Sequence, residues 1–233
     1  MRCTRPRRRA GFSLTELAVV LAVTVLLIGL LLPAMSQVRD NLHRIVCSSN
    51  LRQLGFSTVM YADDYRDCLP FSNLLRAGLP QELMAVHRGD KPQAWDGLGL
   101  LYAMHYCDAP DVYYCPSHTG EHRIERYRDD WLHPGQERIY SNYQYLGDMD
   151  WRSDRGRLRR LDDHLLVIAT DGLRTFGDFN HRTGLNLLAG DGSVRWRDDR
   201  AIARKLPVVP LAGGEGAGDL YEDLWESIEE LNR

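Results

Sequence analysis

Lysine is almost absent from this 233-residue chain, because only two of its 29 basic residues are Lys and the others are Arg. Five of those Arg precede Gly11, and the rest of the chain carries 24 basic against 32 acidic residues, a formal charge of −8. A nucleic-acid-binding domain is expected to show a basic excess or patch, so the charge balance argues against that class. The composition also excludes a disordered or collagen-like chain. The length predicts one globular domain with an appendage.

Charge is missing altogether from one stretch near the N-terminus, between Glu16 and Arg39. Residues 17–32 in its centre are apolar at all but two positions. With flanking residues this stretch reaches the ~17–25 residues that a transmembrane helix needs, and the preceding arginines predict a cytoplasmic N-terminus. Three interpretations compete. They are a secretory signal peptide with a small-x-small cleavage site at residues 34–36, an uncleaved membrane anchor, and a specialised leader.

The third interpretation rests on residues 11–17, GFSLTEL, which place a carboxylate inside the apolar segment. An ionisable residue there points to a function that neither a signal peptide nor a simple anchor needs. The segment resembles the class III leader of type IV prepilins and type II secretion pseudopilins. The resemblance implies that a prepilin peptidase cuts after Gly11 and that Phe12 becomes the N-methylated first residue. It also implies that Glu16 attracts a neighbouring subunit's amino terminus during assembly, because opposite charges attract strongly at low dielectric. Pro33 matches the helix-kinking proline of many pilins.

Beyond Pro33 the apolar pattern changes from continuous to periodic. Helical spacing links Val38, Leu42, Ile45, Val46, Leu51, Leu54, Val59 and Met60. We therefore predict one helix from about residue 12 to about residue 65, amphipathic in its later part. Shorter helices are expected at residues 74–86, 98–106 and 219–231, the last after a flexible Gly-rich link at residues 212–218.

Strand patterns gather in the second half of the chain. They cover residues 139–146, 164–170, 185–189 and 193–196. The last two runs flank Gly190-Asp191-Gly192, and an Asp-Gly pair between strands favours a tight hairpin turn. We expect an antiparallel sheet whose apolar face covers the amphipathic part of the long helix. The predicted fold class is α+β and pilin-like, with a long N-terminal helix packed on a small antiparallel sheet.

These patterns divide the chain into five predicted parts. They are a removed leader at 1–11, a transmembrane and assembly segment at 12–35, an amphipathic stalk helix at 36–65, an α+β body at 66–211, and a Gly-rich link with a short acidic helix at 212–233.

A second resemblance lies near the C-terminus, where His181 is followed by nine residues and then Asp191-Gly192. This H-x9-DG element is similar to one in a large group of bacterial prepilin-like proteins, often described as pseudopilin G-like. In that group the same leader precedes segments similar to residues 47–65 and to Tyr114-Cys115-Pro116-Ser117. One mild departure is Thr15, where the group more often has Ile.

Four cysteines would remain after cleavage, and an exported chain would meet an oxidising compartment where three pairings are available. We favour Cys47–Cys115, which would link the stalk helix to the body, with Cys68–Cys107 as the second bond. Buried unpaired thiols are the alternative. A zinc site is disfavoured because none of the cysteines occurs as C-x2-4-C.

Asp171, His181, Asn186 and Asp191 form the best candidate for a ligand cluster. The pseudopilin G resemblance implies calcium bound by loop oxygens, and calcium prefers carboxylate and carbonyl oxygen. Histidine is a poor calcium ligand, however, and Asp-Gly pairs are explained as turn residues. The favoured alternative is therefore that His181 hydrogen-bonds a backbone turn or Asp191, with no cofactor. We find no nucleotide-binding loop, Ser-His-Asp pattern or paired carboxylates, and we predict no enzyme.

The sequence thus predicts a prepilin-like structural subunit that assembles through its N-terminal helix into a type II secretion pseudopilus or a type IV pilus-like fibre. Its partners would be prepilin peptidase, other pilin or pseudopilin subunits, an inner-membrane assembly platform and membrane lipid, with no nucleic acid. It would cross the bacterial inner membrane once, with a cytoplasmic N-terminus and a periplasmic body. The alternative is a secreted or signal-anchored periplasmic binding protein or hydrolase.

Overall fold

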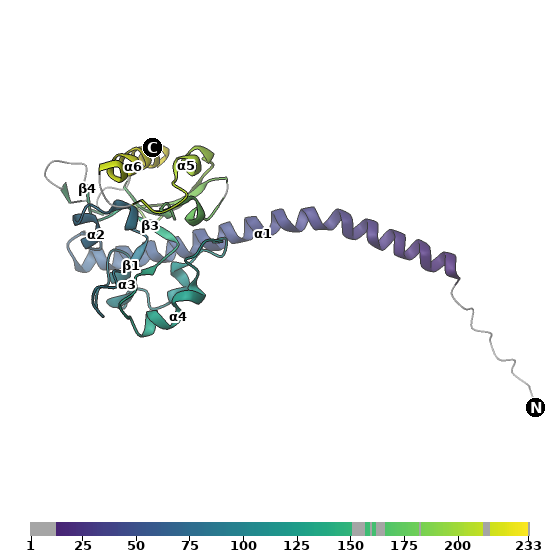
Figure 1. The fold of residues 1–233 in the computed structure, drawn as a ribbon, viewed down its shortest axis with the longest axis horizontal. Helices are drawn as coiled ribbons and strands as arrows, with labels where there is room; N and C mark the ends of the chain where they lie inside the picture. The colour runs from purple at the N-terminus through teal and green to yellow at the C-terminus, as the bar shows by residue number, and fades with distance from the viewer. Residues whose placement is uncertain are drawn as a thin grey trace, which may run out of the picture. The chain divides into compact units, whose positions relative to one another are not determined.

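The computed structural model describes residues 13–150, 157–158, 160–161, 166–181, 183–211 and 215–232. The chain divides into two compact units, residues 1–42 and residues 43–233. The described residues combine helices with small antiparallel sheets (Figure 1), so the predicted α+β class is confirmed. The predicted cleavage site, Gly11 and Phe12, lies outside the described residues.

Helix α1 spans Leu14–Asp64, within two residues of the predicted ends. It begins at Ser13, whose hydroxyl accepts a hydrogen bond from the Glu16 backbone N–H at 3.2 Å. It ends before two residues with left-handed backbone conformations, Arg66 at φ 57° and Asp67 at φ 61°. The helix continues through position 33, the predicted site of a kink.

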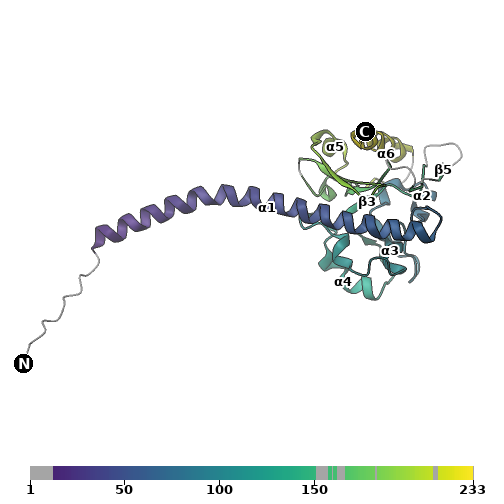
Figure 2. The same cartoon turned by 180° about the vertical axis from the view of Figure 1, so that it is seen from behind.

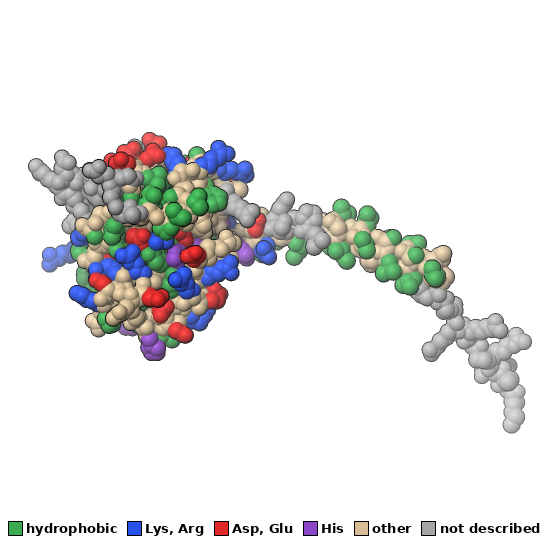
Figure 3. Space-filling model, viewed as in Figure 1, with side chains coloured by type: hydrophobic (Ala, Val, Ile, Leu, Met, Phe, Trp, Pro, Cys, Tyr) green, Lys and Arg blue, Asp and Glu red, His purple; other side chains and the backbone are tan. Residues whose placement is uncertain are grey.

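One segment of α1, Leu14–Leu31, is long and apolar enough to cross a membrane. None of its 18 residues is buried, and Figure 3 shows the green hydrophobic side chains along this part of the helix. Exposed apolar surface of this extent requires an apolar environment or a partner. The predicted membrane-length helix near the N-terminus is therefore confirmed in its length and its apolar composition.

The part of α1 within the globular unit has one buried face. Its buried residues follow helical spacing at Cys47, Leu51, Leu54, Thr58 and Tyr61. This part of α1 packs closely against strand β7 (Leu185–Ala189). A Cβ atom added at Gly55 would lie only 2.7 Å from Leu188 Cδ1. On its other side Ser57 Oγ donates a hydrogen bond to the Tyr106 carbonyl. Figures 1 and 2 show this part of α1 between two pairs of helices. Helices α5 (Arg200–Lys205) and α6 (Glu215–Asn232) lie on one side, and helices α3 (Gly99–Ala103) and α4 (Ile124–Leu132) lie on the other.

The predicted apolar face of this region was only partly correct. Exposed positions include Val38, Leu42, Ile45, Val46, Val59 and Met60. The buried face instead uses Cys, Thr and Tyr beside the two leucines, and these side chains can bury most of their surface while they satisfy one polar atom. A prediction based only on the spacing of aliphatic residues therefore assigned several exposed positions to the buried face.

The main sheet is antiparallel, with strand order β3-β6-β7-β8. Its strands are β3 Tyr143–Tyr145, β6 Val167–Asp171, β7 Leu185–Ala189 and β8 Val194–Arg197. The predicted β7–β8 hairpin is confirmed, with Leu188 paired to Val194. Its turn contains Gly192 at φ +77°, a conformation that favours glycine.

Smaller elements surround this sheet. Two further two-stranded antiparallel sheets pair β1 Ala85–His87 with β2 Ile139–Tyr140, and β4 Met149–Asp150 with β5 Arg157–Leu158. The helical elements are α2 Asn73–Arg76, η1 Pro80–Glu82, α3 Gly99–Ala103, η2 Pro110–Tyr113, α4 Ile124–Leu132, η3 Phe176–Asp178, α5 Arg200–Lys205 and α6 Glu215–Asn232.

Three secondary-structure predictions need correction. The helix expected at residues 74–86 is split into α2, η1 and β1, because Gly78 takes φ +70° and Pro80 starts a new turn. The strand expected at residues 139–146 is divided between β2 and β3. Helix α6 begins at Glu215, so the described end of the predicted Gly-rich link is already helical.

Candidate metal centre

Four buried side chains from distant parts of the sequence converge within the globular unit. They are Cys47, Cys115, Asp171 and His181, and their ligand atoms all lie within 4.8 Å of one another. Each residue exposes 8% or less of its surface. The cluster unites α1, the segment after η2, the last residue of β6 and the loop before β7.

Local structure fixes the position of each side chain. Cys47 lies on the buried face of α1, four residues before Leu51. The Cys115 backbone N–H donates a hydrogen bond to Asn142 Oδ1 at 3.1 Å. The His181 ring packs edge-on against the Trp196 indole, with a centroid separation of 5.4 Å. The cluster is therefore built into the packing of the unit rather than carried on an exposed loop.

The reactive atoms point at a common centre. Cys47 Sγ donates a hydrogen bond to Asp171 Oδ1 at 3.0 Å. His181 Nε2 lies 3.7 Å from Cys115 Sγ and 3.8 Å from the same Asp171 oxygen. The two cysteine sulfurs, the imidazole nitrogen and the carboxylate oxygen thus face one another directly.

The Asp171 carboxylate is held by a dense set of hydrogen bonds. Its Oδ2 accepts from the Asn186 backbone N–H at 2.6 Å and from Asn186 Nδ2 at 3.1 Å. Its Oδ1 also accepts from Asn180 Nδ2 at 3.0 Å. These amide donors compensate for the removal of a carboxylate from water and fix its orientation.

The surroundings shift the acidities of three members of the cluster. Burial raises the pKa of Cys47 well above its usual value. Burial also acts to raise the pKa of Cys115, but hydrogen bonds from Cys47 and His181 outweigh it and lower that pKa to about 7. Burial acts to lower the pKa of His181, but Cys115 and Asp171 outweigh it and raise that pKa. The site therefore favours a Cys115 thiolate next to a charged imidazole.

A catalytic cysteine-histidine relay does not fit this geometry. In such a relay one imidazole nitrogen faces the nucleophile and the other nitrogen faces the orienting carboxylate. Here the same atom, His181 Nε2, faces both Cys115 Sγ and Asp171 Oδ1. The Cys115 sulfur, the His181 nitrogen and the Asp171 oxygen instead converge on one point, as ligands around an ion do.

The structure brings Asp171 and His181 of the predicted oxygen cluster together with Cys47 and Cys115. Asp191 lies in the exposed β7–β8 turn, where its Oδ1 accepts a hydrogen bond from the Ser193 backbone N–H at 2.9 Å. Asn186 is close, but its amide nitrogen donates to Asp171. The two remaining members, Asp171 and His181, are joined by two thiols, and sulfur is not a calcium ligand. The favoured alternative was a His181 hydrogen bond to Asp191 or to a backbone turn, and the structure places the Nε2 atom of His181 3.7 Å from Cys115 Sγ.

All four cysteines among the described residues are free thiols, so neither predicted disulfide is formed. The sequence nevertheless selected the right neighbours in Cys47 and Cys115, whose sulfurs share the cluster. The absence of a C-x2-4-C pair disfavoured a zinc site in the sequence, but such pairs are needed only when one loop supplies two ligands. A signal was available in Cys47, which lies at i−4 and i−7 from Leu51 and Leu54 on a helix and so faces inward.

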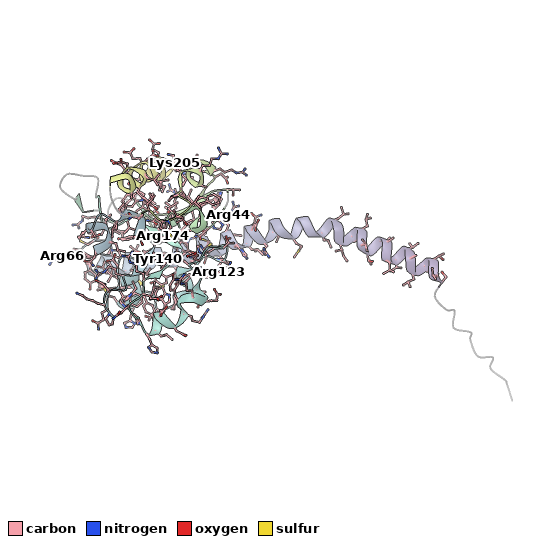
Figure 4. The ribbon with its side chains drawn as sticks, in the orientation of Figure 1. Arg44, Arg66, Arg123, Tyr140, Arg174 and Lys205 are labelled. Atoms are coloured by element: carbon pink, nitrogen blue, oxygen red, sulfur yellow. The ribbon has the colours of Figure 1, made fainter. Side chains whose placement is uncertain are left out.

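A buried polar network continues from the cluster through Asn180. His118 Nδ1 lies 3.0 Å from Asn180 Oδ1, and His118 Nε2 lies 4.0 Å from Asp178 Oδ1. His122 Nε2 lies 3.9 Å from the same Asp178 oxygen, and 3.4 Å from the Arg174 guanidinium. Arg174, seen beside Tyr140 in Figure 4, places a positive charge next to these two histidines and so opposes cation binding there.

No protein-family model matches this chain, and it matches neither a curated protein nor a solved structure.

Proposed function

We propose that this chain is a prepilin-like structural subunit that assembles through α1 into a type II secretion pseudopilus or a type IV pilus-like fibre. A prepilin peptidase would remove residues 1–11 and leave Phe12 as the methylated first residue. The mature subunit would cross the bacterial inner membrane once, with its globular unit on the periplasmic side. An inner-membrane assembly platform and sibling subunits would be its partners, and it would have no catalytic role.

The observation that carries this proposal is the continuity of α1. A single helix runs from an exposed apolar segment at Leu14–Leu31 into the core of the globular unit at Cys47 and Leu51. A secreted binding protein or hydrolase has no use for such continuity, because its signal segment is discarded. In a fibre subunit, the same helix anchors the precursor in the membrane and then forms the contacts of the polymer.

Glu16 supports the proposal through its position at the start of α1. The Ser13 backbone N–H donates a hydrogen bond to Glu16 Oε2 at 2.8 Å, and Ser13 Oγ accepts from the Glu16 backbone N–H at 3.2 Å. This reciprocal pair is a capping box. It holds the carboxylate in the first turn of α1, close in sequence to Phe12, where it would attract a neighbouring subunit's amino group.

Apolar residues beyond the membrane-length segment supply further assembly surface. Val38, Leu42, Ile45 and Val46 are exposed and lie at helical spacing. A stripe of this spacing packs well against another helix. In the proposed fibre these residues would contact the α1 helices of neighbouring subunits.

The charge of Glu16 can be separated from its capping role by two variants. Glu16→Ala removes both the charge and the capping hydrogen bond, whereas Glu16→Gln removes the charge and keeps an acceptor that completes a capping box. We expect both variants to enter the membrane and both to be incorporated at least about tenfold less with wild-type subunits, since attraction to an amino terminus needs the charge. Incorporation is measured by cross-linking a tagged variant to untagged wild-type chains in membranes.

Thr15→Ala is the matched control, because Thr15 is exposed, neutral and adjacent in sequence. It should be incorporated normally. Normal incorporation of Glu16→Gln with loss in Glu16→Ala would assign Glu16 to helix capping alone. Normal incorporation of both would show that Glu16 has no role in assembly.

A further inference from the structure

We propose that Cys47, Cys115, Asp171 and His181 bind one Zn²⁺ ion as four protein ligands. This site lies in the globular unit, residues 43–233, whereas Glu16 and the apolar segment belong to the other unit. The inference therefore does not depend on the proposed assembly role.

The distances between the ligand atoms match a tetrahedral zinc site. Zinc bonds are about 2.3 Å to sulfur and about 2.0–2.2 Å to nitrogen or oxygen, so the edges of a tetrahedron of such ligands are about 3.3–3.8 Å. The Cys115 Sγ to His181 Nε2 distance is 3.7 Å, and the His181 Nε2 to Asp171 Oδ1 distance is 3.8 Å. The Cys47 Sγ to Asp171 Oδ1 distance is 3.0 Å. All the ligand atoms lie within 4.8 Å of one another, so movements of up to about 1 Å would form the site.

The donor set selects the metal. Two thiolates and an imidazole suit zinc and other soft or borderline metals, whereas calcium and magnesium require oxygen ligands. Four protein ligands in a buried site leave no open position for a substrate or water, and this is the arrangement of a structural zinc centre. Cys47 and Asp171 are fully buried.

Outer hydrogen bonds complete the arrangement that a zinc centre requires. Asn186 holds Asp171 Oδ2, which leaves Oδ1 directed at the other ligands. The side-chain amide of Asn180 donates a hydrogen bond from Nδ2 to that Oδ1. His118 Nδ1 in turn contacts the side-chain Oδ1 of Asn180. The carboxylate is thereby preset to bind through one oxygen.

Zinc binding would displace two protons, one from the Cys47 thiol and one from the Cys115–His181 pair. The filled site would carry two thiolates, one carboxylate and one Zn²⁺, a net charge of −1. Nearby, the Arg44 guanidinium lies over the Trp196 ring that packs on His181, 4.3 Å from its centroid. The ion would link α1, the segment after η2, the end of β6 and the loop before β7 in the core.

A Cys47–Cys115 disulfide is the competing chemistry in an oxidising compartment. It would remove the Cys47 hydrogen bond to Asp171 and the thiol partner of His181. It would thus leave a buried carboxylate and imidazole without the sulfurs on which they converge. A metal ion satisfies all four groups at once.

Metal analysis of the full-length protein, purified in detergent with Zn²⁺ present, tests the proposal. We expect one zinc per chain, and at least a tenfold lower content in Cys115→Ser. Cys68→Ser is the matched control and should keep one zinc, because Cys68 lies outside the cluster. Asn186→Ala should weaken zinc binding by about 10–100-fold, as expected for loss of an outer-shell partner.

Cobalt substitution of the wild-type chain gives a readout that needs no variant. Co²⁺ bound by two thiolates and an imidazole should show sulfur-to-cobalt charge-transfer absorption and the intense visible bands of tetrahedral coordination. Three results would overturn the proposal. They are absence of these bands with no zinc in the wild-type protein, a Cys47–Cys115 disulfide in its peptide map, or full zinc retention in Cys115→Ser.

Discussion

Asp171→Ala is expected to lower the free energy of unfolding by about 3–5 kcal/mol, the cost of removing one partner from a buried, fully bonded polar group. Both carboxylate oxygens of Asp171 accept hydrogen bonds, from Asn186, Asn180 and Cys47. The variant leaves these donors buried and unpaired. Asp171→Asn should be almost as damaging, because an amide in either orientation points its N–H groups at donors.

Asp191→Ala is the matched control, since both aspartates precede a glycine in the sequence. Asp191 is exposed and its carboxylate caps the turn at Ser193, so its loss should cost less than about 1 kcal/mol. Urea denaturation of the detergent-solubilised chain, followed by tryptophan fluorescence, measures both. Equal stability of the two variants would contradict the assignment of Asp171 to the structural centre.

Trp131→Ala is expected to lower the free energy of unfolding by about 3–5 kcal/mol, the usual cost of removing a large buried aromatic side chain. Trp131 is 1% exposed, and its ring packs at a tilt against the Tyr113 ring with a centroid separation of 4.7 Å. Its Nε1 donates a hydrogen bond to the Tyr114 hydroxyl at 3.0 Å. Because Tyr113 and Tyr114 precede Cys115, the same contacts also position the segment that supplies one metal ligand.

Leu132→Ala provides the control for this variant, because Leu132 is the next residue of α4 and is 66% exposed. Its loss should change the free energy of unfolding by no more than about 0.5 kcal/mol. Thermal unfolding followed by near-ultraviolet circular dichroism compares the two. A Trp131→Ala protein as stable as Leu132→Ala would show that the aromatic cluster does not hold α4 in place.

The N-terminal helix was predictable because its signal is local and long. Continuous apolar residues and the later helical spacing agree over the length of α1. The β7–β8 hairpin was predictable for a related reason. Its Asp191-Gly192 turn lies between the mostly apolar residues 185–189 and the alternating residues 193–196, and it favours their pairing directly.

The rest of the fold depends on contacts that a local pattern does not contain. Helix α4 was missed because only Tyr127 and Trp131 of its inner face are buried, and its other positions are mostly charged or polar. Helix α5 has six residues and starts at the Asp199 cap, a signal too short to stand out. The region between residues 66 and 138 buries both aliphatic and aromatic side chains, but they come from short elements that show no sustained periodic pattern.

The candidate metal centre could be predicted only in part. His181 and Asp171 were identified as ligand candidates, and Cys47 and Cys115 as neighbours, but they were placed in two separate hypotheses. Their union requires that β6 end beside the α1 face that carries Cys47, and this is a tertiary fact. Asp191 was placed in the same candidate cluster as Asp171, but Asp171 lies in the core and Asp191 is exposed.

The mass of the N-terminal peptide of the mature chain tests the central claim, that this protein is a processed prepilin-like subunit, most directly. Membrane and soluble fractions of cells that contain a prepilin peptidase are separated, the chain in each fraction is digested, and its first peptide is fragmented. The account predicts a mature chain that begins at Phe12 with one added methyl group on its amino nitrogen. A chain that begins at Gln37, and has therefore lost residues 14–31 as an ordinary signal peptide, would contradict it.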